Sequence, residues 1–392
     1  MTQETQRAIR SVYLVFGACG VVIASLLSRV PQLRDALRLS PKGLGILLLS
    51  IAVGALASLP FAGTVVHRIG AANTVRFGAA VASAGLAIGA IGTEVGTAAV
   101  AIGLFLLGFG SGQWDVAQNV EGAAVEQRLG RSIMSRFHAA FSLGTVGGAL
   151  GGAAMNLLDV PPLLHLLGIS VLVAIVTWIA CRSFLPALDD AHGGTREHGS
   201  AFQAWTEPRT LLIGVFVLCM AFAEGTGNDW LGVAAIDGYD ASATLGSFAY
   251  VLFVTAMTAG RWFGPRYLDR YGRVMVMRCG ALIAMVGVLI VVFGPALSTA
   301  LIGTLLWGIG TALGFPTGMS AAADDPTLAA RRVSVVATIG YAAFLAGPAA
   351  IGAIGNSSGV LRALTLTAAM LALGAAVAGS TRPLVIAKAA TP

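Results

Sequence analysis

The sequence predicts an all-α membrane protein with twelve transmembrane helices in two pseudo-symmetric six-helix halves. The chain has 392 residues, of which 56% are apolar and only 11% are charged, whereas a soluble domain has roughly a quarter of its residues charged. Long apolar stretches recur along the chain, each close to the ~20 residues that a helix needs to cross the hydrocarbon core of a bilayer. One long polar stretch divides them into two equal sets. Most of the surface is therefore expected to face lipid.

The apolar stretches are expected to be helices. Lipid offers the backbone no hydrogen-bonding partner, so only helices or closed barrels can cross it, and the stretches lack the alternation of a barrel strand. The first stretch resembles a signal peptide at its start, but its apolar run continues past Cys19, which favours an uncleaved helix. The predicted spans are 11–28, 43–63, 74–93, 97–119, 137–157, 162–182, 210–230, 244–263, 275–294, 299–320, 334–354 and 361–380.

The basic residues predict the orientation of the chain. If the N-terminus is cytoplasmic, five of the 24 lysines and arginines fall outside and the other nineteen fall inside, as the positive-inside rule requires. Both termini are therefore expected on the cytoplasmic side of the membrane. The net charge of +6 is attributed to this bias, not to nucleic-acid binding. The four cysteines lack the spacing of a metal or redox site, so neither a metal nor a cofactor is expected.

The two halves repeat each other. The polar stretch 185–209 is predicted to be a cytoplasmic linker between an N-terminal half, 1–184, and a C-terminal half, 210–392. The segment that begins at His67 corresponds to the segment that begins at Asp269, at an offset of 202 residues in the numbering. Such duplicated halves, with a binding site at their interface, are a common design of secondary transporters.

The segment after the eighth predicted span is similar to the D-R-x-G-R loop of the Major Facilitator Superfamily. Asp269, Arg270 and Arg273 match this pattern in the second half, whereas His67 and Ala71 replace its first and last residues in the first half. The resemblance covers essentially the whole chain and implies a transporter, not an enzyme, that works as a monomer. In that family the loop helps to set the balance between inward-facing and outward-facing states. Gating is thus the role implied for His67, Arg68, Asp269, Arg270 and Arg273, although their charges could instead serve topology alone.

Polar residues inside the fourth predicted span are candidates for function. A charge in the hydrocarbon core costs several kcal/mol, so an intramembrane carboxylate is a functional hypothesis by default. Helical spacing places Ser111, Asp115, Gln118 and Asn119 on one face. Asp115 could gain and lose a proton during transport, or it could form an ion pair that helps helix packing. His138, at the start of the next span, could relay protons or make a local hydrogen bond.

The seventh predicted span supplies a second set of candidates. Glu224 and Asn228 share a helical face, and Asp229 and Trp230 could close the outer mouth of a cavity. Trp230 could equally be an anchor at the membrane surface. The candidates for proton coupling are Asp115, Glu224 and His138, and those for substrate binding are Gln113, Trp114, Gln118, Asn119, Asn228, Asp229 and Trp230.

Two further resemblances bear on the transported solute. An acid followed four residues later by asparagine, as in Asp115 and Asn119, resembles the fucose-permease branch of proton/sugar symporters, although Leu27 stands where that branch has an aspartate. The pattern from Glu224 to Trp230 resembles uncharacterised bacterial inner-membrane members of the superfamily. The leading expectation is proton-coupled symport of a small hydrophilic solute, such as a sugar or a related metabolite. The alternative is a proton-coupled exporter of drugs or amphipathic metabolites.

Overall fold

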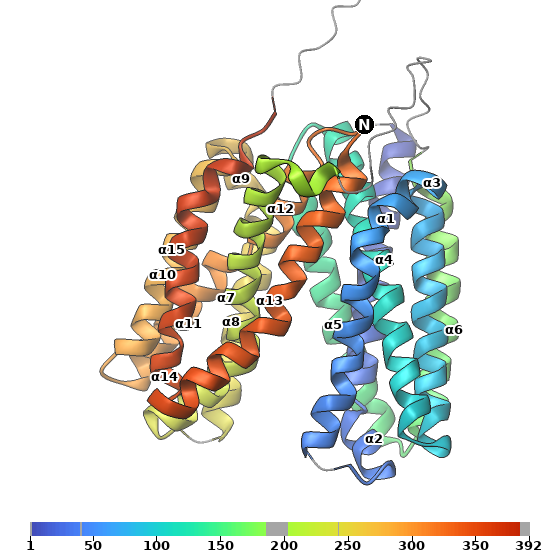
Figure 1. Cartoon of the computed structure of the whole chain (residues 1–392), viewed down its shortest axis with the longest axis horizontal. Helices are drawn as coiled ribbons and strands as arrows, with labels where there is room; N and C mark the ends of the chain where they lie inside the picture. The colour runs from blue at the N-terminus through green and yellow to red at the C-terminus, as the bar shows by residue number, and fades with distance from the viewer. Residues whose placement is uncertain (1, 40, 186–202, 242, 385–392) are drawn as a thin grey trace, which may run out of the picture. The chain divides into compact units, whose positions relative to one another are not determined.

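The computed structural model describes residues 2–39, 41–185, 203–241 and 243–384. In these ranges every regular element is a helix, which confirms the predicted all-α class (Figure 1). Most of the predicted linker, residues 186–202, lies outside the described part of the chain.

The chain forms two compact units, each of which is described here by itself. The first comprises Met1–Gly130 and Phe137–Gln203, and the second comprises Arg131–Arg136 and Ala204–Pro392. The helices of the first unit are α1 (Gln3–Leu27), α2 (Val30–Ala36), α3 (Pro41–Val95), α4 (Thr97–Leu129), α5 (Met134–Leu157, whose first three residues belong to the second unit), α6 (Pro162–Ala180) and η1 (Cys181–Ser183).

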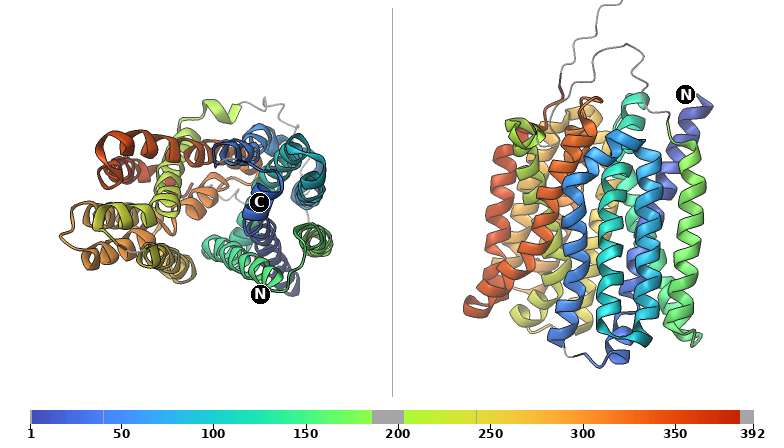
Figure 2. Two further views of the ribbon diagram at one scale, coloured as in Figure 1. Left: turned by 90° about the horizontal axis from the view of Figure 1, so that it is seen from below. Right: turned by 45° about the vertical axis from the view of Figure 1, so that its right-hand side comes forward.

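The second unit contains the remaining helices. In both views of Figure 2 its long helices run along one another, with α7 in contact with α8, α11, α13 and α15. Its elements are η2 (Gln203–Thr206), α7 (Pro208–Tyr239), α8 (Ala243–Phe263), α9 (Pro265–Tyr271), α10 (Arg273–Phe293), α11 (Leu297–Thr311), α12 (Gly314–Ala322), α13 (Ala329–Ser358), α14 (Val360–Ala363), α15 (Thr365–Val377) and η3 (Ala378–Thr381).

The twelve predicted spans map onto these helices. Among the described residues, 9 helical segments are long and apolar enough to cross a membrane. One of them, within α3, holds the second and third predicted spans, which meet at a kink at Gly70. The fifth and eighth predicted spans fall on α5 and α8, and Phe248–Phe263 is the apolar part of α8. The tenth span is divided between α11 and α12, and the twelfth is divided among α14, α15 and η3.

The sequence repeat extends to the backbone of the two kinks. Gly70 has φ 80° and ψ 161°, and Gly272, at the offset of 202, has φ 78° and ψ 158°. A residue with a Cβ atom rarely adopts a positive φ, whereas glycine does so at little cost. Glycine therefore allows the same sharp turn between consecutive spans in both units.

The repeat also extends to the helix crossings. A Cβ added to Gly85 of α3 would lie 2.6 Å from the carbonyl oxygen of Gly103 in α4, and a Cβ added to Gly287 of α10 would lie 2.5 Å from that of Gly303 in α11. The members of these pairs correspond at the offsets of 202 and 200. Small residues of this kind let helix backbones approach closely in a membrane, so the two units share the same pattern of backbone contacts.

Glycines also bring α1 and α5 together. A Cβ added to Gly144 would lie 2.0 Å from the carbonyl oxygen of Gly17, and one added to Gly20 would lie 2.2 Å from that of Phe141. By contrast, a Cβ at Gly147 would meet no atom within 4 Å. This crossing positions the start of α5, with His138, beside α1 and α4.

Candidate functional site

Polar residues of α4 form a buried cluster around Asp115 in the first unit. Asp115 is 7% exposed, Gln118 1% and Asn119 0%. The side-chain amides of Gln118 and Asn119 each donate to Oδ1 of Asp115, both at 3.1 Å, and Asn119 also donates to the backbone oxygen of Asp115 at 2.8 Å. The i, i+3 and i+4 spacing on one helix accounts for these contacts. The cluster holds an acidic group inside a helix that is long and apolar enough to cross a membrane.

His138 of α5 joins this cluster through Asn119. Its Nε2 lies 3.1 Å from Oδ1 of Asn119. The amide nitrogen of Asn119 already donates to Asp115, so Oδ1 is its acceptor and Nε2 of His138 carries the proton that it donates. The imidazole ring is buried and lies edge-on to the ring of Phe16 in α1, with the ring centroids 5.0 Å apart. Helices α4 and α5 thus bring two titratable groups together on either side of one amide.

Gln113 and Trp114 lie apart from this cluster, although the sequence analysis grouped them with it. The amide of Gln113 donates to the backbone oxygen of Ser58 in α3 at 2.9 Å. Trp114 is 0% exposed, and a Cβ added to Gly78 of α3 would lie 3.0 Å from its Cβ atom. Both residues therefore pack against α3. Two residues along a helix correspond to a rotation of about 200°, which explains why Gln113 turns away from the face of Asp115.

An ion pair between Glu224 of α7 and Arg261 of α8 lies inside the second unit. Nη2 of Arg261 donates to both carboxylate oxygens of Glu224, at 2.7 and 2.8 Å. The Nε of Arg261 also donates to the backbone oxygen of Ala312, between α11 and α12, at 3.3 Å. Arg261 is one of the nineteen basic residues predicted to be cytoplasmic, but it is 5% exposed and belongs to the helical core of the unit. Its position within the predicted span 244–263 was the signal that could have revealed it.

The other candidates of α7 surround Glu224 unevenly. Asn228 lies one turn beyond Glu224 on the same face, is partly exposed, and makes no side-chain hydrogen bond within the described part of the chain. Asp229 is exposed. The ring of Trp230 lies against α13, where a Cβ added to Gly352 would be 3.5 Å from it. Of these residues, Asn228 is the one placed beside Glu224.

The predicted gating residues have different surroundings. Arg273 donates to Asp324, which also accepts from Arg209 at 2.7 Å, so one carboxylate holds the ends of α7 and α10. The side chain of Asp269 accepts from the backbone N–H of Ser132 at 2.9 Å, within the second unit. Arg270 lies over the ring of Tyr271. His67 and Arg68, the degenerate counterparts in the first unit, are exposed.

Asp324 and a buried cluster at Arg29 were missed by the sequence analysis. Arg29 follows the first predicted span, where it was expected to be either an anchor at the membrane surface or a cation in a cavity. It is 1% exposed; its Nε donates to Nδ1 of His165 at 3.2 Å and its Nη1 to Asn156 at 3.3 Å. Burial lowers the pKa of Arg29 from its ordinary value. The partners of Arg29 lie more than a hundred residues away in the chain and leave no local pattern, so spacing could not reveal either of its contacts.

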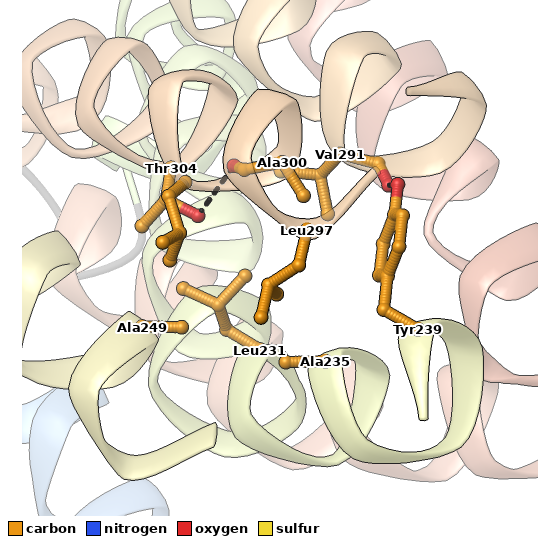
Figure 3. A pocket seen from close by; sticks show the side chains of 9 residues that line it. Leu231, Ala235, Tyr239, Ala249, Val291, Leu297, Ala300 and Thr304 are labelled. Carbon is orange, nitrogen blue, oxygen red and sulfur yellow. Dashed lines mark hydrogen bonds between the residues drawn. The ribbon is translucent and has the colours of Figure 1, made fainter. Parts of the chain in front are cut away.

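A small apolar pocket in the second unit does not include any of these candidates (Figure 3). The hydroxyl of Tyr239, on its wall, donates to the backbone oxygen of Val291 at 2.6 Å. The lining residues have no charged side chain, and we assign no ligand to this pocket. They are Leu231, Ala235, Tyr239, Ala249, Val291, Leu297, Ala300, Leu301 and Thr304.

In the described part of the chain, the long apolar helices with polar clusters buried among them define a multi-pass membrane protein. More particularly, the model of the Major Facilitator Superfamily matches residues 12–348, and the chain belongs to this family.

The relatives agree with this assignment. The chain is 31% identical over 364 residues to an uncharacterized MFS-type transporter of Yersinia pestis, with 92% of each chain covered. It is 29% identical over 373 residues to the membrane protein MosC of Rhizobium meliloti, covering 94% of this chain and 88% of that one.

Among solved structures, the fold resembles that of the superfamily transporter FucP in the outward conformation. The TM-score is 0.81 at 15% sequence identity, with 96% of this chain and 98% of that chain covered. The proton:xylose symporter XylE has a TM-score of 0.73 at 12% identity, covering 95% of this chain and 94% of that one.

Proposed function

We propose that the protein is a secondary active transporter that moves a small hydrophilic solute by alternating access and couples this movement to protons. The observation that supports the proposal most directly is the buried cluster of Asp115, Gln118, Asn119 and His138. It places a carboxyl and an imidazole on one polar network inside an apolar unit. Intramembrane carboxylates and histidines of this kind form proton relays in other transporters.

In this proposal Asp115 is the principal proton-linked carboxylate and Glu224 is the second. His138 is a titratable group linked to Asp115 through Asn119. Gln118, Asn119 and Asn228 contact polar groups of the solute, while Gln113 and Trp114 hold α4 against α3. The charges at Asp269, Arg270 and Arg273 influence the balance between conformations. The fold is shared with proton-coupled sugar symporters, which makes the same kind of coupling available to this chain.

The proposal also includes the arrangement in the membrane. The chain lies in the bacterial inner membrane as a monomer with both termini in the cytoplasm, and residues 185–209 connect the halves 1–184 and 210–392. The excess of arginine and lysine in the segments assigned to the cytoplasm supports this orientation.

The test is uptake in proteoliposomes under an imposed proton gradient. Asp115→Asn keeps the shape of the side chain but cannot titrate, so we expect it to reduce the dependence of uptake on the proton gradient. Glu94→Gln, which changes an exposed carboxylate of α3, is the matched control and should behave as the unmodified protein does. Gradient-driven uptake that survives Asp115→Asn unchanged would refute the role of Asp115.

The same experiment decides between the two directions of transport. A symporter accumulates the solute when the proton gradient points inward. An exporter that exchanges the solute for protons expels it under the same gradient, so the sign of the net flux separates the two functions.

A further inference from the structure

The ion pair of Glu224 and Arg261 is costly where it lies. The two side chains are 14% and 6% exposed, on helices whose neighbours are apolar. Removing two charges from water costs several kcal/mol per ion, and their mutual attraction often does no more than compensate. Within membrane-spanning segments, paired charges typically mark the path of a substrate or an ion. The pair is therefore better explained by exchange of one partner than by stability.

Glu224 is the partner that can be replaced. Its carboxylate offers two oxygens to a single guanidinium nitrogen of Arg261, and any carboxylate on a solute offers the same two acceptors. Arg261 is the more buried partner and is also held by the backbone oxygen of Ala312. Arginine stays charged at all physiological pH values. The fixed member of the pair is thus a cation, and the more exposed member is the anion.

The surroundings of Glu224 suit an organic molecule. Asn228 presents an amide one turn away, with no side-chain partner within the described residues. A Cβ added to Gly225 would lie 3.1 Å from the ring of Phe344 in α13. The ring of Tyr341 lies beside that of Phe344, with centroids 5.9 Å apart, and beside that of Phe315 at 6.2 Å. A hydrogen-bonding group thus lies one turn from Glu224, and a row of three aromatic rings begins beside its neighbour Gly225.

Several of the helices that pack against α7 carry no charge within the described residues. The sequences of α11, α12, α15 and η3, which pack against α7, contain no Asp, Glu, Lys, Arg or His. On α13 the charged residues are Arg331 and Arg332 in its first turn, and Arg332 is paired with Glu207 at 2.7 Å. The remaining titratable groups on the helices that pack against α7, and on α7 itself, are Arg209, Cys219, Asp229, Asp237, Tyr239, Tyr250, Tyr341 and Arg362.

We propose that the solute is an organic anion whose carboxylate replaces that of Glu224 on Arg261 when Glu224 takes up a proton. This inference rests on the proposed transport function and names its substrate class. In the exchange one proton adds to the Glu224 carboxylate and one solute carboxylate takes its place beside the guanidinium, so the net charge of the pair is unchanged. A neutral sugar brings no negative charge to the guanidinium when Glu224 is protonated, whereas a carboxylate does.

The first test needs no transport. In Glu224→Ala the carboxylate is removed and space for a small anion is created beside Arg261. We expect millimolar formate or acetate to raise the Tm of this purified variant, while formamide and acetamide do not. In the double variant Glu224→Ala/Arg261→Gln, the anions should change the Tm no more than the amides do. Equal stabilisation of both variants by formate, or none of either, would overturn the proposal.

The second test uses the unmodified protein in proteoliposomes that contain a pH-sensitive dye. Sugar acids and aromatic acids are compared with their neutral analogues, for example galacturonate with galactose and phenylacetate with phenylacetamide. We expect proton uptake with each carboxylate compound. The concentration that gives half-maximal uptake should be ~30-fold higher or more for the neutral analogue, which corresponds to about 2 kcal/mol. Arg261→Gln should abolish this preference, and the exposed Asp237→Asn of α7 should not.

The outcomes separate this inference from the proposed function. Proton uptake driven by galactose and unaffected by Arg261→Gln would refute the anion site and leave proton-coupled transport standing. Absence of proton movement with every compound would count against coupled transport, while the formate experiment would still decide whether Arg261 accepts an external carboxylate.

Discussion

Nε2 of His138 lies 3.1 Å from the side-chain oxygen of Asn119, and the amide nitrogen of the same asparagine donates to Asp115. The asparagine therefore fixes the orientation of both neighbours. Since Nε2 of the imidazole carries a proton in this arrangement, Nδ1 is the nitrogen that takes up a second proton. The amide of Asn119, which does not titrate, thus links the protonation of His138 in α5 to that of Asp115 in α4.

His138→Gln tests this link. The glutamine amide can still donate to Asn119 but cannot titrate, so we expect uptake to persist while its dependence on pH is reduced. The measurement is the initial rate of uptake in proteoliposomes between about pH 5 and pH 8. A pH profile identical to that of the unmodified protein would show that His138 does not titrate during transport.

We expect Gln113 to contribute to stability and Gln118 to contribute to transport. Gln113 donates to the backbone of Ser58, so Gln113→Ala should lower the free energy of unfolding by about 1–2 kcal/mol and leave the half-saturation of uptake unchanged. Gln118 contacts Asp115, so Gln118→Ala should change uptake more than Tm. Thermal unfolding in detergent and uptake kinetics provide the two readouts, and the reverse assignment of effects would contradict this division.

The crossing of α1 and α5 predicts opposite outcomes for two glycines on one helix. Gly144→Ala places a Cβ 2.0 Å from the carbonyl oxygen of Gly17, so the helices must move apart, at a cost of about 1–3 kcal/mol. Gly147→Ala meets no atom within 4 Å and should leave Tm unchanged or slightly raised. Scanning fluorimetry of the two purified variants checks this. Equal Tm values would mean that the crossing is not close-packed in the membrane protein.

Asp324 should be important because it pairs with two arginines. Asp324→Asn leaves Arg209 and Arg273 without their carboxylate, and we expect a loss of about 1–3 kcal/mol in the free energy of unfolding. Asp237→Asn on α7, where the carboxylate is exposed, should be neutral. The comparison is made by thermal unfolding at low and high salt. If Asp324→Asn unfolds at the same temperature as the unmodified protein, the network does not stabilise this end of the second unit.

The fold was largely predictable from the sequence, and the site only in part. Membrane spans have a strong one-dimensional signal, because every apolar residue of a span contributes to it. The cluster of Asp115, Gln118 and Asn119 was also predictable, since helical periodicity places these residues together. The same periodicity could have excluded Gln113, which is two residues from Asp115 and faces α3 instead.

The remaining contacts depend on which helices become neighbours. Arg261 reaches Glu224 across 37 positions, and Arg29 reaches His165 across 136. Neither partner could be read from the sequence, because each lies on another helix. No pattern within one span distinguishes an arginine that faces water from one that faces a carboxylate on the next helix.

The matching glycine contacts of the two units have a consequence for how the duplicated halves diverged. At these crossings the backbones of two helices are in contact, so the geometry of each helix pair depends on glycines that have no side chain. Residues on the other faces of these helices can change without disturbing the crossing. At an offset of 200 in the sequence, the counterpart of Asp115 is Phe315 and the counterpart of Glu224 is Ala24. The two halves thus share one architecture but carry their acids on different helices. Replacing one half with a second copy of the other would preserve the helix crossings and remove one of the two acidic centres.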